Sequence, residues 1–138
     1  HLPGGITLLD DTYNASPAAT SAALDLLGEM PGRRLALLGD MLELGELAET
    51  FHKQIGAQAA THVDALLTIG ELAETIAHEA IKAGLDNVFH CPTKLEARES
   101  LQDMLRTGDT LLVKGSRALA LETIVEELEE ILIKEESL

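Results

Sequence analysis

Short apolar runs alternate with amphipathic segments along the whole chain, and only a few residues join each run to the next segment. The runs occupy residues 6–9, 35–38, 65–69, 88–90 and 110–113. Nearly every position in them is apolar, as expected for strands that helices cover on both faces. The alternation predicts an α/β fold, with a Rossmann-like, mainly parallel sheet of five to six strands and helices on both faces.

Start and stop signals predict where the helices lie. Ser16 as N-cap and Pro17 at the first helical position begin the first helix, which ends before Pro31 and Gly32. We expect its inward face to carry Ala19, Ala22, Leu26 and Met30.

The later helices have similar signals. The second spans about residues 46–60, and the third spans 71–83 and ends at Gly84, a left-handed cap. Thr93 and Glu96 have capping-box spacing at the start of the fourth. The residues expected to point inward are Leu47, Phe51 and Ile55 in the second helix, and Leu121, Ile124, Val125, Leu128, Ile131 and Leu132 in the last, whose other face is acidic and solvated.

Charge and cysteine content narrow the classes of function. The 138 residues carry 24 acidic and 10 basic side chains, a net charge of −14, which argues against binding nucleic acid or an anionic membrane surface. No apolar run is long enough to insert into a membrane. One cysteine, Cys91, excludes an intrachain disulfide and suits a cytoplasmic protein.

The chain shows no internal repeat or linker, so residues 1–138 are expected to form a single domain. It begins with His1 and runs directly into the first strand. We therefore expect it to begin partway through a larger protein.

The clearest candidate for chemistry follows the last strand. Lys114 and Arg117 flank Gly115 and Ser116 at a strand end, where ligands bind in open α/β sheets. Two cations beside free backbone N–H groups suit a carboxylate or phosphate, through charge-assisted hydrogen bonds. The alternative is that both cations neutralise nearby carboxylates.

Asp10 and Asp11 end the first strand and allow three interpretations. Such a carboxylate can accept hydrogen bonds from ribose hydroxyls, bind Mg²⁺ with a neighbour, or cap the following turn. The chain has neither a G-x-G-x-x-G nor a G-x-x-x-x-G-K-[ST] motif, so it carries no phosphate-cradling loop of its own.

The histidines give weaker signals. His52 follows Phe51 on the second helix and is either a substrate contact or, more commonly for a helical histidine, a packed or surface residue. Neither His90 with Cys91 nor any other group has the spacing of a metal site, so no metal ligand is expected. No arrangement of a nucleophile, a histidine and an acid is evident either.

Three motifs, in this order and spacing, resemble the C-terminal domain of the Mur ligases over essentially the whole chain. They are LLDDTYNASP at residues 8–17, LGDMLELG at 38–45 followed by His52, and LVKGSR at 112–117. Within the family, they are most similar to the branch that adds D-Ala-D-Ala to a UDP-muramoyl tripeptide.

The resemblance implies one domain of a three-domain, ATP-dependent ligase of peptidoglycan precursor synthesis, a cytoplasmic enzyme. A central domain, absent here, would carry the phosphate loop and hold most of the ATP and Mg²⁺, while another domain binds the UDP-muramoyl peptide. ATP phosphorylates a carboxylate of that peptide, and an incoming amine, here D-Ala-D-Ala, attacks the acyl phosphate. The C-terminal domain would close over ATP and position the dipeptide. By itself it would be inactive and contains no catalytic residue.

The resemblance also implies roles for individual residues. Asp11, Tyr13 and Asn14 would contact ATP, and the residues expected to bind the dipeptide are Lys114, Gly115, Ser116 and Arg117. Asp40, Glu43 and His52 would line the cleft between domains, with no more specific role implied.

Three positions depart from the family pattern. Ser16 stands where a second Asn is usual, which keeps a helix cap but removes a side-chain amide. Ala118 and Ala120 replace residues that are commonly glycine or polar, which changes the expected details of the carboxylate pocket.

Two other classes remain open. A receiver-type signalling domain also has paired aspartates after its first strand and a lysine after its fifth, but it needs an aspartate after the third, where this chain has Gly70. A folylpolyglutamate or cyanophycin synthetase type of amide ligase has a related fold, and the DDTYN sequence argues against it.

Overall fold

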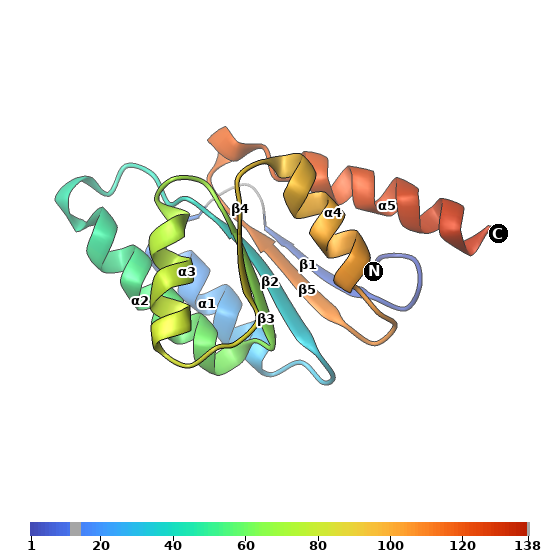
Figure 1. Ribbon diagram of the computed structural model, residues 1–138, viewed down its shortest axis with the longest axis horizontal. Coiled ribbons are helices and arrows are strands. Elements are labelled where there is room, and N and C mark those ends of the chain that lie inside the picture. Colours follow the sequence, from blue (N-terminus) through green and yellow to red (C-terminus); the bar gives the residue numbers. More distant parts are fainter. Residues whose placement is uncertain (12–14, 138) are drawn as a thin grey trace.

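The computed structural model describes residues 1–11 and 15–137. Strands and helices alternate along this part of the chain, as the sequence predicts (Figure 1). In order they are β1 Thr7–Asp11, α1 Pro17–Gly28, β2 Arg34–Gly39, α2 Ala48–His62, β3 Ala65–Ile69, α3 Ala73–Lys82, β4 Val88–Cys91, α4 Lys94–Met104, β5 Thr110–Lys114 and α5 Glu122–Glu136. Two short 3₁₀ turns, η1 Gly45–Leu47 and η2 Arg117–Leu119, precede α2 and α5.

The described strands form one five-stranded sheet in the order β1-β5-β2-β3-β4, and every neighbouring pair is parallel. The last strand in the sequence therefore lies between the first and the second. Leu112 of β5 pairs with Leu9 on one side and Ala36 on the other. This confirms the α/β class and the parallel sheet at the lower of the two expected strand numbers.

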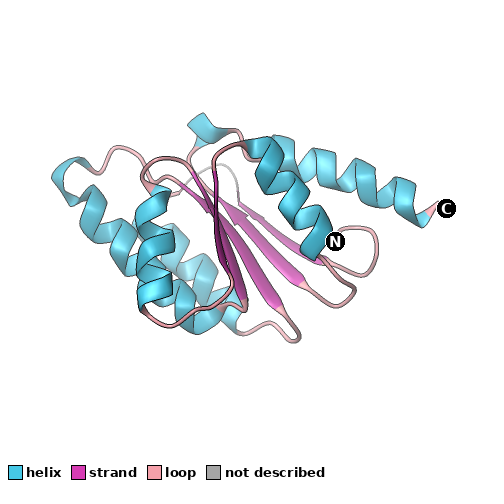
Figure 2. Ribbon diagram, viewed as in Figure 1, coloured by secondary structure: helices cyan, strands magenta, loops and turns pink. Residues whose placement is uncertain are grey.

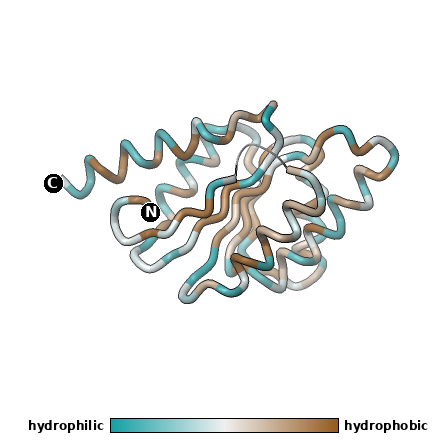
Figure 3. Tube along the Cα trace, turned by 180° about the vertical axis from the view of Figure 1, so that it is seen from behind, coloured by the Kyte–Doolittle hydropathy of each residue, from teal (hydrophilic) through white to brown (hydrophobic). Residues whose placement is uncertain are grey.

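Helices cover both faces of the sheet, also as predicted (Figure 2). One core lies beneath α1, α2 and α3 and includes Leu112, whereas the other lies beneath α4 and α5 and includes Leu111 and Val113. Figure 3 shows the hydrophobic colour concentrated along the strands between these layers. Alternate side chains of one strand thus enter opposite cores, which explains why all of β5 is buried.

The expected helix signals are present. The Ser16 hydroxyl accepts a hydrogen bond from the Ala19 N–H at 3.1 Å, and the Thr93 hydroxyl accepts one from the Glu96 N–H at 3.1 Å. Gly84 follows α3 with φ +105°, in the left-handed region that glycine adopts without strain. These local signals fix the starts of α1 and α4 and the end of α3 correctly.

The expected inward face of α1 is wrong. The helix buries Thr20, Leu24 and Leu27, while Leu26 is 50% exposed and Met30 lies beyond the helix end at Gly28. Ala22 is exposed and Ala19 only partly buried. An alanine-rich helix offers two overlapping rows of apolar residues, and the row with two leucines in the core removes more apolar surface from water.

The buried residues of α2 also differ in part from those expected from the sequence, whereas those of α5 agree. Leu47 is exposed and belongs to η1, and α2 buries His52, Ile55, Gly56 and Ala59, with Phe51 partly buried. The burial of His52 agrees with the packed alternative that the sequence left open for it. In α5, Ile124, Val125, Leu128 and Leu132 are buried and Ile131 is half-buried, and the glutamates face solvent.

Candidate functional site

The carboxyl ends of the parallel strands meet at one edge of the sheet and bring the three sequence motifs together. β1 ends at Asp11, whose backbone lies opposite that of Lys114 at the end of β5. Lys114 also lies opposite Leu38, one residue before the end of β2. Motifs that are about 25 to 100 residues apart in sequence therefore share one strand-end region.

The segment after β5 presents one unusual polar atom. Ser116 is 9% exposed, and its hydroxyl has no hydrogen-bond partner among the described residues. Lys114 is buried, at 1% exposed, and Arg117 is exposed. A buried hydroxyl without a partner is costly, and a ligand atom at this place can complete its bonding. The described residues include one other buried hydroxyl without a partner, that of Thr20 in α1.

Gly115 has a packing role at this edge. A Cβ added there would lie 3.1 Å from the Cα of Gly39 and 2.6 Å from a methyl carbon of Leu121. The ends of β5 and β2 therefore approach closely, beneath the start of α5, with no room for a side chain between them. This close approach is what brings the two strand-end loops into contact.

Asp40, the first residue after β2, is buried and joins three elements. Its Oδ1 accepts a hydrogen bond from the Ala73 N–H at 2.7 Å, at the first residue of α3. Its backbone carbonyl accepts one from the Ser116 N–H at 3.0 Å. A carboxylate at a helix N-terminus satisfies a free N–H and interacts favourably with the helix dipole. The Asp40 side chain is thus directed to α3.

Gly70 makes room for that carboxylate. A Cβ at this position would lie 2.4 Å from Oδ1 of Asp40, and Gly70 has φ +109°. The sequence places Gly70 directly after the third predicted strand and implies no role for it. Its signal was a lone glycine directly after a buried strand.

His52 is buried in α2, at 1% exposed, with both ring nitrogens hydrogen-bonded. Nε2 accepts the Met41 N–H at 3.1 Å, and Nδ1 donates to the Ala48 carbonyl at 2.6 Å. A carbonyl only accepts and an amide N–H only donates, so the ring is neutral and protonated on Nδ1. The histidine therefore fastens the loop after β2 to α2.

Glu43 differs from the other two members of its motif. It is exposed and has φ +62°, which is unusual for a residue with a side chain. Among the described non-glycine residues, only Ala120, after η2, shares a positive φ, at +50°. Both strained positions border the strand-end region, as backbone strain often does near functional sites.

The expected nucleotide contacts are only partly placed. Tyr13 and Asn14 lie outside the described residues, and Asp11 is placed by its backbone alone, at the end of β1. Their contact with ATP stays a prediction.

An apolar groove of about 550 Å³ runs between β1 and α1. Ala19, Ala22 and Leu26, which the pattern assigned to the core, line one wall, while Leu8 and Leu9 line the other. Asp10 also lines the groove. The α1 residues that were wrongly expected to face the core thus line this groove instead.

Residues 1–11 and 15–137 contain no group of three His, Cys, Asp or Glu side chains arranged to hold a metal ion. No helix within this range has the length and hydrophobicity needed to span a membrane. Cys91 is buried, and burial, reinforced by the nearby charge of Glu96, raises the pKa of its thiol. A buried thiol with a raised pKa is a poor nucleophile at neutral pH.

Comparison with known proteins identifies the family. The family described as "Mur ligase, glutamate ligase domain" matches residues 1–117. The UDP-N-acetylmuramoyl-tripeptide–D-alanyl-D-alanine ligase of Bacillus subtilis (strain 168) is 39% identical over 128 residues, which is 90% of this chain and 28% of the relative. The enzyme of the same name from Escherichia coli (strain K12) is 40% identical over 124 residues, 89% of this chain and 27% of the relative.

Solved structures agree with the sequence comparison. The MurF ligase from Thermotoga maritima in complex with ADP superposes with a TM-score of 0.82 at 29% identity, covering 98% of this chain and 32% of that one. MurF from Acinetobacter baumannii gives a TM-score of 0.79 at 28% identity, covering 92% of this chain and 29% of that one. The chain thus spans between a quarter and a third of the length of the curated relatives it matches.

Proposed function

Because this chain belongs to the Mur ligase family, glutamate ligase domain, we propose that it is the C-terminal domain of an ATP-dependent ligase that joins D-Ala-D-Ala to a UDP-muramoyl tripeptide. The relatives from Bacillus subtilis and Escherichia coli carry the name of that reaction. The product is a peptidoglycan precursor, and the proposed location is the cytoplasm. Membership of this family argues against the receiver-type signalling domain.

The observation that carries this proposal is the buried Ser116 hydroxyl, which lacks a partner among the described residues. It lies between the cations Lys114 and Arg117, at the strand edge where α/β proteins bind ligands. A carboxylate oxygen there would accept the serine hydrogen bond and interact with the positive charge. We assign this segment to the carboxylate end of the incoming dipeptide.

Holding the dipeptide by its carboxylate leaves its amino group free to attack. The dipeptide then needs only to be oriented toward the activated carboxyl group of the UDP-muramoyl peptide, so the chain contributes through positioning rather than through a nucleophile of its own. Closure of the domain over the reactants would exclude water from the activated carboxylate.

ATP supplies the phosphoryl group that activates that carboxylate, and Mg²⁺ accompanies it. The position of Asp11 at the end of β1, opposite Lys114, fits a ribose-binding carboxylate, with Tyr13 and Asn14 following it in sequence. The chain has no phosphate-binding loop, so we propose that the longer protein supplies it. The 138-residue chain alone should therefore show no ATP-dependent ligation, and detectable ligation would contradict this assignment.

The substrate assignment is tested by Arg117→Ala in the full-length protein. We expect the KM for D-Ala-D-Ala to rise about tenfold or more, the loss expected for one charge-assisted hydrogen bond, with the KM for ATP little changed. Arg106→Ala is the matched control, because Arg106 is exposed in the loop before β5, at the other end of that strand. An equal rise in the KM values for D-Ala-D-Ala and ATP would contradict a carboxylate-binding role for Arg117. If the full-length protein ligates glutamate or another amine instead of D-Ala-D-Ala, the folylpolyglutamate or cyanophycin synthetase alternative is favoured.

A further inference from the structure

We propose that His52 is a positioning residue, which sets the place of Ser116 through a single peptide group between Asp40 and Met41. This inference rests on the proposed function, in which Ser116 contacts the dipeptide. Neither the family match nor the names of the relatives assigns a role to His52.

The connection consists of hydrogen bonds at both ends of one peptide group. The Asp40 carbonyl accepts the Ser116 N–H at 3.0 Å, and the Met41 N–H donates to Nε2 of His52 at 3.1 Å. The carbonyl of Asp40 and the N–H of Met41 belong to the same peptide bond, which is planar and rigid. A rotation that breaks one of these hydrogen bonds therefore also disturbs the other.

The histidine is itself fixed at both ends of its ring. Nδ1 donates to the Ala48 carbonyl, one helical turn earlier in α2, so the ring orientation and the tautomer are set by the helix backbone. The resulting series runs from the Ala48 carbonyl through the imidazole and the Asp40–Met41 peptide to the Ser116 N–H. Hydrogen bonds in such a series polarise one another and strengthen together.

A purely space-filling role for His52 does not explain these contacts. A hydrophobic side chain of similar size would fill the same volume but leave the Met41 N–H without its partner. The carboxylate of Asp40 is held separately, by the Ala73 N–H of α3. The loop after β2 is thus anchored to α2, α3 and the β5 end, and its peptide group faces the segment that carries the ligand-binding hydroxyl.

Two neutral substitutions separate the bonds of the imidazole. In His52→Gln the amide oxygen reaches the ε position and keeps an acceptor for the Met41 N–H. In His52→Asn the amide reaches only the δ position, so it retains a donor for the Ala48 carbonyl and leaves Met41 without a partner. Both variants remove the aromatic ring. His52→Gln keeps only the bond to Met41 and His52→Asn keeps only the bond to Ala48, so a comparison of the two shows which bond Ser116 depends on.

Amide hydrogen exchange in the chain is the first readout, since it does not depend on activity. We expect His52→Asn to speed exchange at both Met41 and Ser116 by about tenfold, the effect of losing one hydrogen bond, while His52→Gln stays within about threefold of the original protein. The Leu105 amide, which bonds to Leu101 in α4, is the internal control. Faster exchange at Met41 with no change at Ser116 would overturn the proposed connection.

Kinetics of the full-length protein are the second readout. His52→Asn should raise the KM for D-Ala-D-Ala about tenfold and leave the KM for ATP unchanged, and His52→Gln should restore most of the loss. Equal KM values in both variants would show that His52 is only structural. If Ser116→Ala leaves the KM for D-Ala-D-Ala unchanged, the proposed function of Ser116 is wrong. The hydrogen-exchange data still decide whether His52 and Ser116 are connected through the Asp40–Met41 peptide.

The unsubstituted chain gives a third readout, which stands even if neither variant folds. ¹⁵N NMR of the His52 ring should show a protonated Nδ1 and an unprotonated Nε2. The opposite tautomer, or a ring that is doubly protonated at neutral pH, would remove the acceptor for Met41 and overturn the proposal.

Discussion

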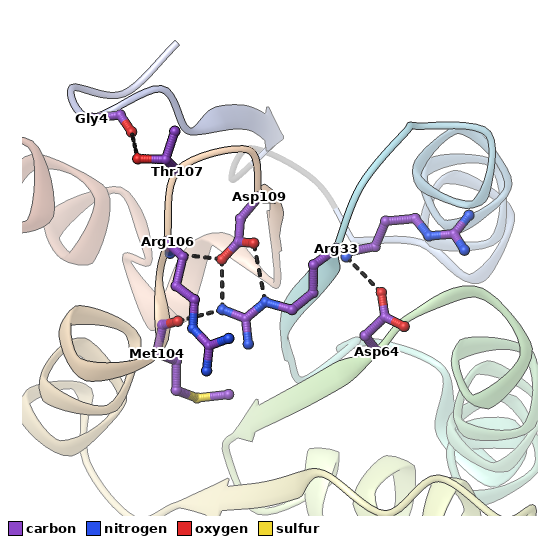
Figure 4. Close-up of polar contacts among 8 residues, drawn as sticks. Gly4, Arg33, Asp64, Met104, Arg106, Thr107 and Asp109 are labelled. Atoms are coloured by element: carbon purple, nitrogen blue, oxygen red, sulfur yellow. Dashed lines mark hydrogen bonds and ion pairs between the residues drawn. The ribbon is translucent and has the colours of Figure 1, made fainter.

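The guanidinium of Arg33 holds the carboxylate of Asp109 at two points, with Nε 3.0 Å from Oδ1 and Nη2 2.6 Å from Oδ2 (Figure 4). Arg33 immediately precedes β2, and Asp109 immediately precedes β5. Oδ2 also accepts the Arg106 N–H at 2.8 Å, and the Asp109 side chain is only 4% exposed. The hydrogen bonds that Arg33 donates to Asp109, reinforced by the charge of that carboxylate, raise the pKa of Arg33. This pair joins two neighbouring strands at the edge opposite the candidate site.

Arg33→Ala should lower the free energy of unfolding by about 2 kcal/mol, because it leaves the nearly buried carboxylate of Asp109 with one backbone donor. This loss is smaller than that expected for a fully buried ion pair, because the Arg33 side chain is partly exposed. Urea denaturation measures this loss. Arg33→Lys keeps the charge but not the two-point contact, and should cost about half as much. The double variant with Asp109→Ala should lose less than the sum of the single losses. Strict additivity would show that the pair contributes nothing beyond its separate contacts.

Gly56→Ala should destabilise the fold although alanine favours helices. A Cβ on Gly56, within α2, would lie 2.5 Å from the Ile76 carbonyl oxygen and 2.9 Å from the Glu79 Cβ, both in α3. The two helices must separate to admit it, and we expect a loss of about 2 kcal/mol by thermal or urea denaturation. The control is Ala57→Gly at an exposed position of α2, which should cost only the propensity difference of about 1 kcal/mol. A Gly56→Ala variant as stable as the original chain would show that α2 and α3 pack less closely than described.

Ser116→Ala should separate stability from binding. Removal of a buried hydroxyl that has no partner among the described residues should leave the free energy of unfolding unchanged or raise it by up to about 1 kcal/mol. In the full-length protein, the same change should raise the KM for D-Ala-D-Ala. A fall in stability instead would mean that the hydroxyl has a structural partner, and would remove the main support for a ligand contact.

Ala120→Gly should stabilise the chain by about 0.5–1 kcal/mol. Ala120 has φ +50°, and the strain of about 1–2 kcal/mol that a Cβ causes there exceeds the extra backbone entropy of glycine. The matched control is Ala118→Gly, also between Ser116 and α5 but without a positive φ, which should give no gain. Equal changes in the midpoint temperature of unfolding would contradict strain at Ala120.

Cys91 gives the chain a specific sensitivity to alkaline pH. Burial, together with the charge of Glu96, raises the pKa of the thiol above its ordinary value of 9.0, so folding favours the neutral form. The stabilisation is complete below pH 9 and declines as the pH rises from there through the folded-state pKa. Urea denaturation at several pH values should show a steeper alkaline decline for the original chain than for Cys91→Ala. The thiol should also react slowly with alkylating reagents at pH 8; rapid reaction would contradict its burial.

Most of the fold was predictable because its determinants are local. Apolar runs predicted all five strands to within two residues, and Ser16, Thr93 and Gly84 predicted helix boundaries. The inward face of α1 was not predictable from its pattern, because alanine satisfies either face. Only the packing of Leu24 and Leu27 against the sheet decided it.

The sequence predicted which segments form the candidate site, but not which contacts the individual side chains make there. Parallel strands place their carboxyl ends together, which explains why segments that follow different strands meet at one edge. The sequence does not show that Asp40 caps α3, 33 residues later, or that His52 holds the Met41 amide. Such contacts depend on how loops and helices that are far apart in sequence lie relative to one another, and the local sequence pattern does not determine this arrangement.

The place of β5 in the sheet also governs the order in which the molecule assembles during synthesis. Of the five strands described in this chain, β1 is synthesised first, yet its only strand partner among the described residues, β5, is synthesised last. A nascent chain that ends before Thr110 can pair β2, β3 and β4 but leaves β1 and the neighbouring edge of β2 without their partner. Until β5 is synthesised, the sheet of this chain is therefore incomplete and its unpaired strand edges are open to aggregation. The arrival of β5 joins the two parts of the sheet and forms the strand-end edge of the candidate site in the same step.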